Sequence, residues 1–326
     1  MIDFLSLFKS TDAYKIIKAE KEADRLSHAY LLVCGDGENY IEYLKIIAKI
    51  IACKDGAPCG ECRCCRLIDG GMYPDLTIYP AGDIVLSADA NDLIEQSYIK
   101  PIEGANKIFI INRGETMNGS VQNKLLKTIE EPPKNVHVII GAITESAILP
   151  TVKSRVRKLE IPPFSDKTLY AALKEEYSDE ERLKEAIACG DGTVGAAQKN
   201  YNDEKFKKTV DVVAETITGL TSSKKLLYYS NKICTLNQPV EEVLSVMEQL
   251  FTDMLYNLSG KSELVRNANR IKTLSSADGF NRGAVINALD KITEAKKRKS
   301  FNATDQSVTE WLLFQILEGK FKWRKF

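Results

Sequence analysis

Hydrophobic residues are spaced differently in the two halves of the chain. Up to about residue 165, short apolar runs alternate with longer stretches in which apolar residues recur every three or four positions. The short runs are typical of strands, and the longer spacing is typical of amphipathic helices. We therefore predict an α/β region with a parallel sheet that helices cover on both faces. The predicted strands are 29–33, 75–79, 107–112, 136–142 and 157–161, and the predicted helices lie near 39–52, 88–98, 115–131 and 145–153.

After the Pro162-Pro163 pair the strand pattern ends, and Ser165 is a candidate N-cap for the next helix. Only helical spacing follows, which favours a bundle. The shorter segments lie near 166–177, 179–189 and 193–199, and the longer ones near 203–219, 222–236, 239–258, 282–299 and 304–318. We predict three domains: an α/β domain at 1–164, a small helical domain at 165–201 and an α-helical domain at 202–326.

A cysteine-rich segment, residues 53–65, interrupts the α/β region. Four of its five cysteines have the spacing C-x5-C-x2-C-x2-C, and the tight turn between paired cysteines directs both thiolates to one point. Gly60 stands where such a turn needs a positive φ. We predict a structural zinc ion with no open coordination position, and Cys64 is left as a spare thiol. The predicted ligands are Cys53, Cys59, Cys62 and Cys65.

Other uses of these cysteines fit less well. An all-sulfur set also accepts iron–sulfur clusters, but their cysteines are usually spaced differently. Disulfides belong to oxidising compartments, and the apolar run at the N-terminus is short and broken by Asp3 and Lys9, unlike a signal peptide. No stretch approaches the ~18 apolar residues of a membrane span. The sequence thus predicts thiols in a reducing cytoplasm.

The net charge is zero, with 45 basic and 45 acidic residues. A protein that grips nucleic acid alone normally has a basic excess or stripe, so the balance disfavours that function. The run Lys296–Lys299 and the C-terminal FKWRKF are the best support for it, and we interpret both mainly as solvated helix ends.

The turn after the first strand resembles a phosphate-binding loop but lacks its chemistry. Gly35 and Gly37 lie between a strand and a helix, where such a loop would have a lysine for the phosphates and a Ser or Thr for magnesium. Tyr40 and Ile41 stand there instead. The strand 107–112 also runs into Asn-Arg-Gly-Glu, without an aspartate for magnesium. Both differences disfavour ATP hydrolysis.

Arg155 follows a short predicted helix at the edge of the α/β region, directly after Ser154. A lone arginine is usually a solvated surface charge. An arginine supplied to a neighbouring subunit can instead neutralise charge on a transferring phosphate, which is worth about 10³–10⁵ in rate. The residues alone leave both interpretations open.

These motifs together resemble the bacterial clamp-loader AAA+ subunits of DNA polymerase III. The resemblance covers roughly residues 25–165 and implies an AAA+-type α/β domain, a helical lid at 165–201 that includes Gly192-Thr-Val-Gly195, and a collar at 202–326. In this family the metal is zinc and the arginine acts in trans. The matching motifs are HAYLL at 28–32, YPDL at 73–76 after the cysteines, NKLLKTIEEPP at 123–133 and LPTVKSR at 149–155.

Within the family the degenerate nucleotide motifs favour the non-hydrolysing delta-prime branch. This implies no intrinsic enzyme activity, and a cytoplasmic heteropentamer with motor (gamma/tau) and delta subunits that places a sliding clamp on primed DNA. Two departures stand out: the family's Ser-Arg-Cys ends in Val156, and the short C-x5-C gap makes Cys53 the least secure ligand. The alternatives are a motor subunit with a divergent site and a zinc-dependent nucleic-acid-binding protein.

Overall fold

The computed structural model describes residues 2–54, 58–275, 277 and 279–323 of the chain. By its internal contacts the chain divides into two compact units. The first comprises Met1–Glu176 together with Thr193–Gly195, and the second comprises Tyr177–Gly192 and Ala196–Phe326. The candidate sites described below all lie in the first unit.

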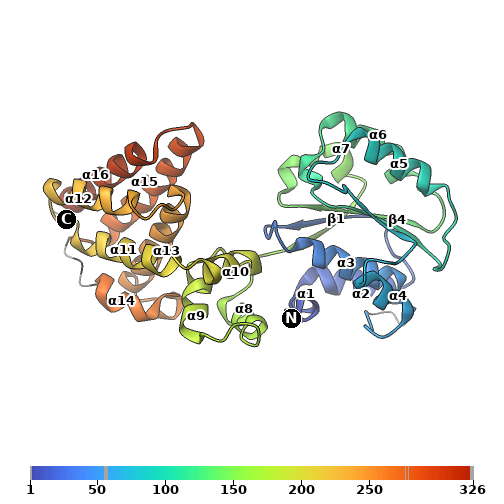
Figure 1. Ribbon diagram of the computed structural model, residues 1–326, viewed down its shortest axis with the longest axis horizontal. Helices are drawn as coiled ribbons and strands as arrows, with labels where there is room; N and C mark the ends of the chain where they lie inside the picture. The colour runs from blue at the N-terminus through green and yellow to red at the C-terminus, as the bar shows by residue number, and fades with distance from the viewer. Residues whose placement is uncertain (1, 55–57, 276, 278, 324–326) are drawn as a thin grey trace. The chain divides into compact units, whose positions relative to one another are not determined.

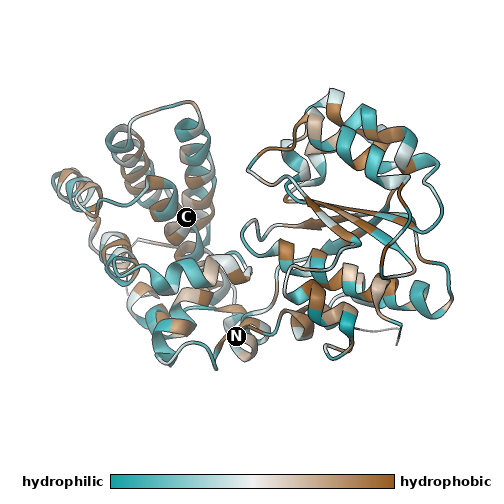
Figure 2. Ribbon diagram, turned by 45° about the vertical axis from the view of Figure 1, so that its right-hand side comes forward, coloured by the Kyte–Doolittle hydropathy of each residue, from teal (hydrophilic) through white to brown (hydrophobic). Residues whose placement is uncertain are grey.

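The first unit contains a five-stranded parallel sheet with the strand order β2-β3-β4-β1-β5. Because all strands run the same way, their carboxyl ends meet at one edge, where parallel sheets usually bind ligands. Much of the sheet is brown in Figure 2, and β4 is buried along its whole length. The strands are β1 (Ala29–Cys34), β2 (Leu76–Tyr79), β3 (Lys107–Ile111), β4 (Val136–Ala142) and β5 (Arg157–Ile161).

Helices cover both faces of this sheet, as the spacing of apolar residues predicts (Figure 1). One face carries α1 (Phe4–Lys9), α2 (Asp12–Glu22), α3 (Tyr40–Ala52) and α4 (Arg63–Asp69). The other carries α5 (Ser87–Ser97), α6 (Gly119–Glu130) and α7 (Pro150–Lys153). Leu93, Val121 and Leu125 of this second layer pack with Phe109 and Ile140 of the sheet in one buried core.

All five predicted strands are confirmed, but several helix predictions need correction. The predicted helix 115–131 is a 3₁₀ turn at Gly114–Thr116 followed by α6, because the Asn118 side chain caps a new helix start by accepting from Val121 N–H. The predicted helix 145–153 is likewise split, since α7 begins at Pro150, a residue suited to the first helical position. Helices α1, α2, α4 and α14 (Ala268–Ser275) were not predicted.

Only helices follow β5 among the described residues, and Ser165 caps the first of them as predicted, accepting from Thr168 N–H. That helix, α8 (Asp166–Leu173), belongs to the first unit. The second unit buries one continuous apolar core between its long helices. The remaining helices are α9 (Glu180–Ala188), α10 (Val194–Asn202), α11 (Phe206–Gly219), α12 (Ser223–Cys234), α13 (Val240–Leu258), α15 (Arg282–Ser300) and α16 (Asp305–Trp323).

A polar network in the second unit ties the end of α9 to the long helices. Arg266 donates from Nη1 to the carbonyl of Gly190 at 2.9 Å and from Nη2 to that of Ile187 at 2.8 Å. The fully buried Asp253 carboxylate in turn accepts from the backbone N–H groups of Arg266 and Asn267. The guanidinium of Arg266 thereby satisfies two carbonyls at the end of α9, and the backbone N–H groups of Arg266 and Asn267 satisfy the buried carboxylate.

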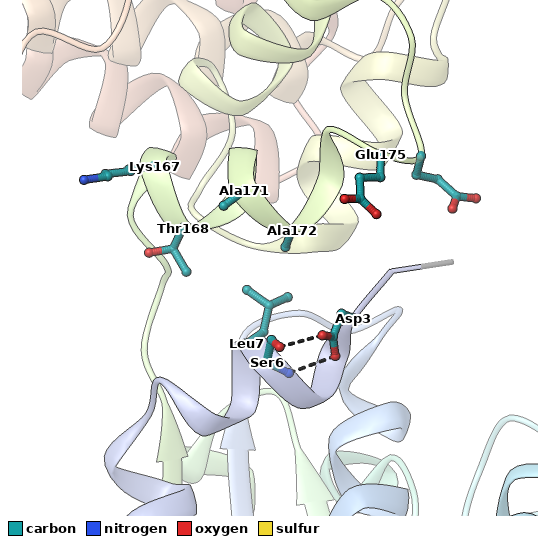
Figure 3. Close-up of a pocket in the computed structure, with 9 residues that line it drawn as sticks. Asp3, Ser6, Leu7, Lys167, Thr168, Ala171, Ala172 and Glu175 are labelled. Atoms are coloured by element: carbon teal, nitrogen blue, oxygen red, sulfur yellow. Dashed lines mark hydrogen bonds between the residues drawn. The ribbon is translucent and has the colours of Figure 1, made fainter. Parts of the chain in front are cut away.

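A groove of about 490 Å³ lies between α1 and α8 in the first unit (Figure 3). Leu7 of α1 faces Ala171 and Ala172 of α8 across it, and Asp3 and Glu175 also line it. The Asp3 carboxylate accepts from the N–H of Ser6 and so caps α1. The groove is separate from the candidate sites below. Across the described residues, no helix is long and apolar enough to cross a membrane.

Candidate functional site

The four predicted ligand cysteines lie together, with their sulfur atoms all within 4.8 Å of one another. The Sγ–Sγ distances are 3.7 Å for Cys53–Cys59, 3.9 Å for Cys53–Cys62 and 4.0 Å for Cys59–Cys65. A disulfide would need about 2.05 Å, so these sulfurs are free thiols. Four sulfurs placed tetrahedrally about 2.3 Å from a zinc ion lie roughly 3.8 Å apart. The cluster therefore fits a tetrahedral metal ion.

Local structure explains why the sulfurs converge. Cys53 follows the last turn of α3, and Cys62 caps the start of α4, so each ends or begins a helix. Between them Gly60 has φ +75°, which confirms the turn that its position predicts. The N–H of Cys65 donates to the sulfur of Cys62, which lowers the pKa of Cys62 to about 7, whereas burial raises the pKa of Cys65. Part of the C-x5-C gap, 55–57, lies outside the described residues.

Cys64 lies outside the four-sulfur cluster and instead neighbours Tyr73. The segment after the cysteines is tied to the loop that precedes β3. The buried Asp75 carboxylate accepts three backbone N–H bonds from that loop, at 2.6 Å from Ile102, 2.8 Å from Glu103 and 2.6 Å from Gly104. Arg63 of α4 also forms an ion pair with Glu103. The cysteine module and this loop are thus one connected structure.

The side chain of Asp36 occupies the turn after β1. Asp36, only 4 % exposed, lies between Gly35 and Gly37 and points its carboxylate at the start of α10. Its Oδ2 accepts from Gly195 N–H at 3.0 Å, and its Oδ1 accepts from Asn39 N–H at 3.2 Å. Burial raises the pKa of Asp36, although the N–H donors favour the carboxylate form. Residues 193–195 belong to the first unit, so this contact lies within it.

Tyr40 fills the position where a phosphate-binding lysine would stand. Its ring is buried and lies against Gly141 of β4, where a side-chain carbon would come 2.7 Å from the ring. Its hydroxyl accepts from Arg113 N–H at 2.6 Å, just beyond β3. The carboxylate of Glu115, the acidic residue after β3, accepts a hydrogen bond from the backbone N–H of Ile143. The carboxyl edge of the sheet is therefore closed by bulky and paired side chains.

Arg155 is less exposed than its sequence position suggests. Its side chain is 35 % exposed, and Nε lies 3.1 Å from Oε2 of Glu130, the last residue of α6. Nη2 donates to Glu130 Oε1 at 3.4 Å, while Nη1 donates to Thr151 O at 3.0 Å and to Ser154 Oγ at 3.2 Å. Arg155 is thus a partly exposed, ion-paired side chain at the place where the ends of α6 and α7 meet, and its role stays a prediction.

The sequence identified the four cysteines, Gly35, Gly37 and Arg155 as candidate site residues. It did not identify three carboxylate side chains that form hydrogen bonds or ion pairs beside them. These are Asp36, Asp75 and Glu130. A carboxylate in a glycine turn is a signal that we did not use, because its partner, Gly195, lies 159 residues away in sequence. Asp75 and Glu130 both belong to the motifs quoted above, YPDL and NKLLKTIEEPP.

Comparison with known proteins gives consistent matches. The family described as "DNA polymerase III, delta subunit" matches residues 9–165. The DNA polymerase III subunit delta' of Bacillus subtilis is 24 % identical over 313 residues, which cover 94 % of this chain and 95 % of that protein. The tau/gamma subunit of Haemophilus influenzae is 31 % identical over 146 residues, which cover 44 % of this chain and only 21 % of that protein.

One solved structure, a DNA polymerase III gamma subunit-related protein from Thermotoga maritima, is 15 % identical. The alignment covers 95 % of this chain and 100 % of that one, with a TM-score of 0.45.

Proposed function

Since the chain belongs to the clamp-loader family of DNA polymerase III subunits, we propose that it is a non-hydrolysing, delta-prime-type subunit. In this role it joins motor and delta subunits in a heteropentamer that loads a sliding clamp onto primed DNA. The complex belongs to the polymerase holoenzyme and works in the bacterial cytoplasm. This chain contributes structure and one arginine, and the motor subunits contribute ATP hydrolysis.

The observation that carries this proposal is the closed carboxyl edge of the sheet. Magnesium and the phosphates of ATP need a lysine and a free carboxylate at this edge. Tyr40 stands in place of the lysine, Asp36 is bound to Gly195, and Glu115 is bound to Ile143 N–H. The match to the delta' relative along nearly its whole length supports the same branch. A motor subunit with a divergent site remains the second candidate, because tau/gamma relatives match the α/β region.

The cysteine module is proposed to hold one structural zinc ion through Cys53, Cys59, Cys62 and Cys65. All four tetrahedral positions are then taken by thiolates, so the ion would stabilise the fold without binding substrate. Their sulfur spacing, close to that of a zinc–thiolate tetrahedron, supports this assignment.

Arg155 is proposed to act in trans on the ATP of a neighbouring subunit, with Ser154 beside it. Its guanidinium already pairs with a carboxylate, Glu130, through one hydrogen bond from Nη2 and an ion-pair contact at Nε. A phosphate presents the same kind of oxygen pair, so a neighbour's γ-phosphate can replace Glu130 without a new side-chain geometry. The residues 165–201 and 202–326 are proposed to be the lid and the collar through which the subunit joins the ring.

The isolated chain is expected to show no ATP turnover above background. The assay is steady-state phosphate release by purified protein with magnesium, with a motor subunit of the same complex as the positive control. Hydrolysis at the rate of the motor subunit, abolished by a substitution in this chain's own turn 35–41, would instead identify it as a motor subunit.

Assembly provides the complementary test. Co-expression with candidate motor and delta subunits should yield one complex that contains this chain and opens a sliding clamp. Failure to enter such a complex, combined with tight, steeply salt-dependent DNA binding by the monomer, would favour the nucleic-acid-binding alternative.

A further inference from the structure

The guanidinium of Arg155 has two edges, and different kinds of group hold them. Nη1 donates to Thr151 O at 3.0 Å and to Ser154 Oγ at 3.2 Å, which are neutral acceptors on the same short stretch of chain. Nε and Nη2 face Glu130, the last residue of α6. The neutral contacts keep the guanidinium in place whatever lies opposite its other edge. The contact with Glu130 is therefore the one that a new partner can replace.

This contact does not satisfy the guanidinium. Charge-assisted N–H···O hydrogen bonds are normally about 2.7–2.9 Å long, and arginine and a carboxylate often form two of them in parallel. Here Nη2 donates to Glu130 Oε1 at 3.4 Å. Nε lies 3.1 Å from Oε2, but it is shielded from solvent and donates no hydrogen bond. An unsatisfied buried donor costs free energy, so an acceptor that aligns with both nitrogens binds this edge better than Glu130 does.

Glu130 in turn is weakly held. Its side chain is 54 % exposed, and Arg155 is the cation that it contacts in the described part of the chain. It also stands at the carboxyl end of α6, where the helix dipole disfavours a negative charge. Exposed ion pairs of this kind are weak. The carboxylate thus holds Arg155 in the free chain and is easily displaced.

We propose that Glu130 is a positioning residue that competes with the neighbouring subunit's γ-phosphate for Arg155. This inference rests on the proposed action of Arg155 in trans. While the neighbouring site holds no γ-phosphate, Glu130 keeps the guanidinium within its own chain. A γ-phosphate carries more negative charge than a carboxylate and offers several oxygens, so it displaces Glu130 and engages both Nε and Nη2. When that phosphate leaves, Arg155 returns to Glu130.

The variant Glu130→Gln removes the charge and keeps the shape of the side chain. Competition by a weak ion pair reduces the apparent affinity of Arg155 for phosphate by about two- to fivefold. The variant should therefore lower the ATP concentration for half-maximal hydrolysis at the neighbouring site by about two- to fivefold. The maximal rate should be unchanged, because Arg155 meets the same phosphate once it is engaged. The assay is single-turnover hydrolysis by the reconstituted complex, and the phase that Arg155→Ala slows identifies the site.

Glu131→Gln is the matched control. It removes a carboxylate from the next residue, which is exposed and forms no ion pair within the described ranges of the chain. Its ATP dependence should equal that of the native complex, so a general loss of negative charge at the end of α6 is distinguished from the loss of Glu130 itself.

A second measurement follows the pair in the free chain. Phenylglyoxal modifies guanidinium groups, and peptide mass spectrometry gives the rate at each arginine. Arg155 should react about two- to fivefold faster in Glu130→Gln than in the native chain or in Glu131→Gln. Arg157, which pairs with Glu20 at 3.1 Å, is the internal reference and should react equally in all three.

The outcomes separate this inference from the proposed function. If Arg155→Ala slows hydrolysis but Glu130→Gln has the ATP dependence of the native complex, Glu130 does not compete and the inference fails alone. A lower maximal rate with Glu130→Gln also overturns it, since Glu130 would then orient Arg155 for catalysis. Equal phenylglyoxal rates would show that Glu130 does not hold Arg155 in the free chain. Normal hydrolysis with Arg155→Ala would remove the trans action and the competition together.

Discussion

Replacing Arg155 by alanine should slow ATP hydrolysis at one neighbouring site of the assembled complex by about 10³-fold or more. The guanidinium would no longer neutralise charge that develops on the neighbour's γ-phosphate. Arg155→Lys should rescue poorly, since an ammonium cannot reproduce the planar fork with which a guanidinium binds a pair of phosphate oxygens. The measurement is single-turnover hydrolysis and clamp loading by the reconstituted complex at equal assembly.

The fold should tolerate this substitution. A partly exposed pair such as Arg155–Glu130 contributes about 0–1 kcal/mol to stability, so the chain should remain folded and assemble normally. Arg157→Ala is the matched control: this arginine lies two residues away on β5 and pairs with Glu20 at 3.1 Å. Equal hydrolysis and loading by the Arg155→Ala, Arg157→Ala and native complexes would reduce Arg155 to a structural charge.

Replacing Cys62 by serine should abolish stoichiometric zinc binding and unfold the cysteine module. A structural zinc site contributes its binding energy to folding, about 10–16 kcal/mol in zinc-finger peptides, and a hydroxyl is a poor substitute for a thiolate. Elemental analysis should give about one zinc per native chain and far less for the variant. Hydrogen exchange should rise around 58–75 and in the loop at 102–104, which Asp75 and Arg63 join to the module.

Cys64→Ser serves as the matched control for this experiment. Cys64 is adjacent in sequence to Cys65 but lies outside the four-sulfur cluster, so its replacement should leave the zinc content and the exchange pattern unchanged. A native chain with no bound metal, purified without chelators, would contradict the zinc assignment. The sheet should survive either cysteine substitution, because its core packs around β3, β4 and α6, away from the module.

The features that could be predicted from the sequence are those that depend on residues close together along the chain. The strands could be predicted because each is a short apolar run, and the cysteine cluster because its spacing almost dictates convergence. Helix α2 was not predicted because most of its residues are polar and it buries only Ala13 and Ile17. Helix α4 was not predicted because its seven residues overlap the cysteine segment, which we interpreted by the spacing of its metal ligands.

Contacts between distant residues could not be predicted in the same way. The hydrogen bond between Asp36 and Gly195 joins residues 159 positions apart, and the Arg155–Glu130 pair joins residues 25 positions apart. Neither contact produces a periodic pattern of residues in the sequence. Arg155 could be singled out as a candidate from its motif, but the cis partner that holds it required the packing of α6 against α7. The sequence shows that Tyr40 stands where a phosphate-binding lysine is expected, but it does not show that the tyrosine ring is buried against Gly141.

Helix α3 connects the two regions that distinguish this chain. It starts at Tyr40, beside the turn that Asp36 fills, and ends at Ala52, directly before Cys53 of the cysteine module. Its 13 residues span about 20 Å. Both ends lie beside buried side chains that are held within the chain, the Asp36 carboxylate at one and the Cys53 thiol at the other. A helix held at both ends in this way would act as a rigid connection between the turn after β1 and the cysteine module.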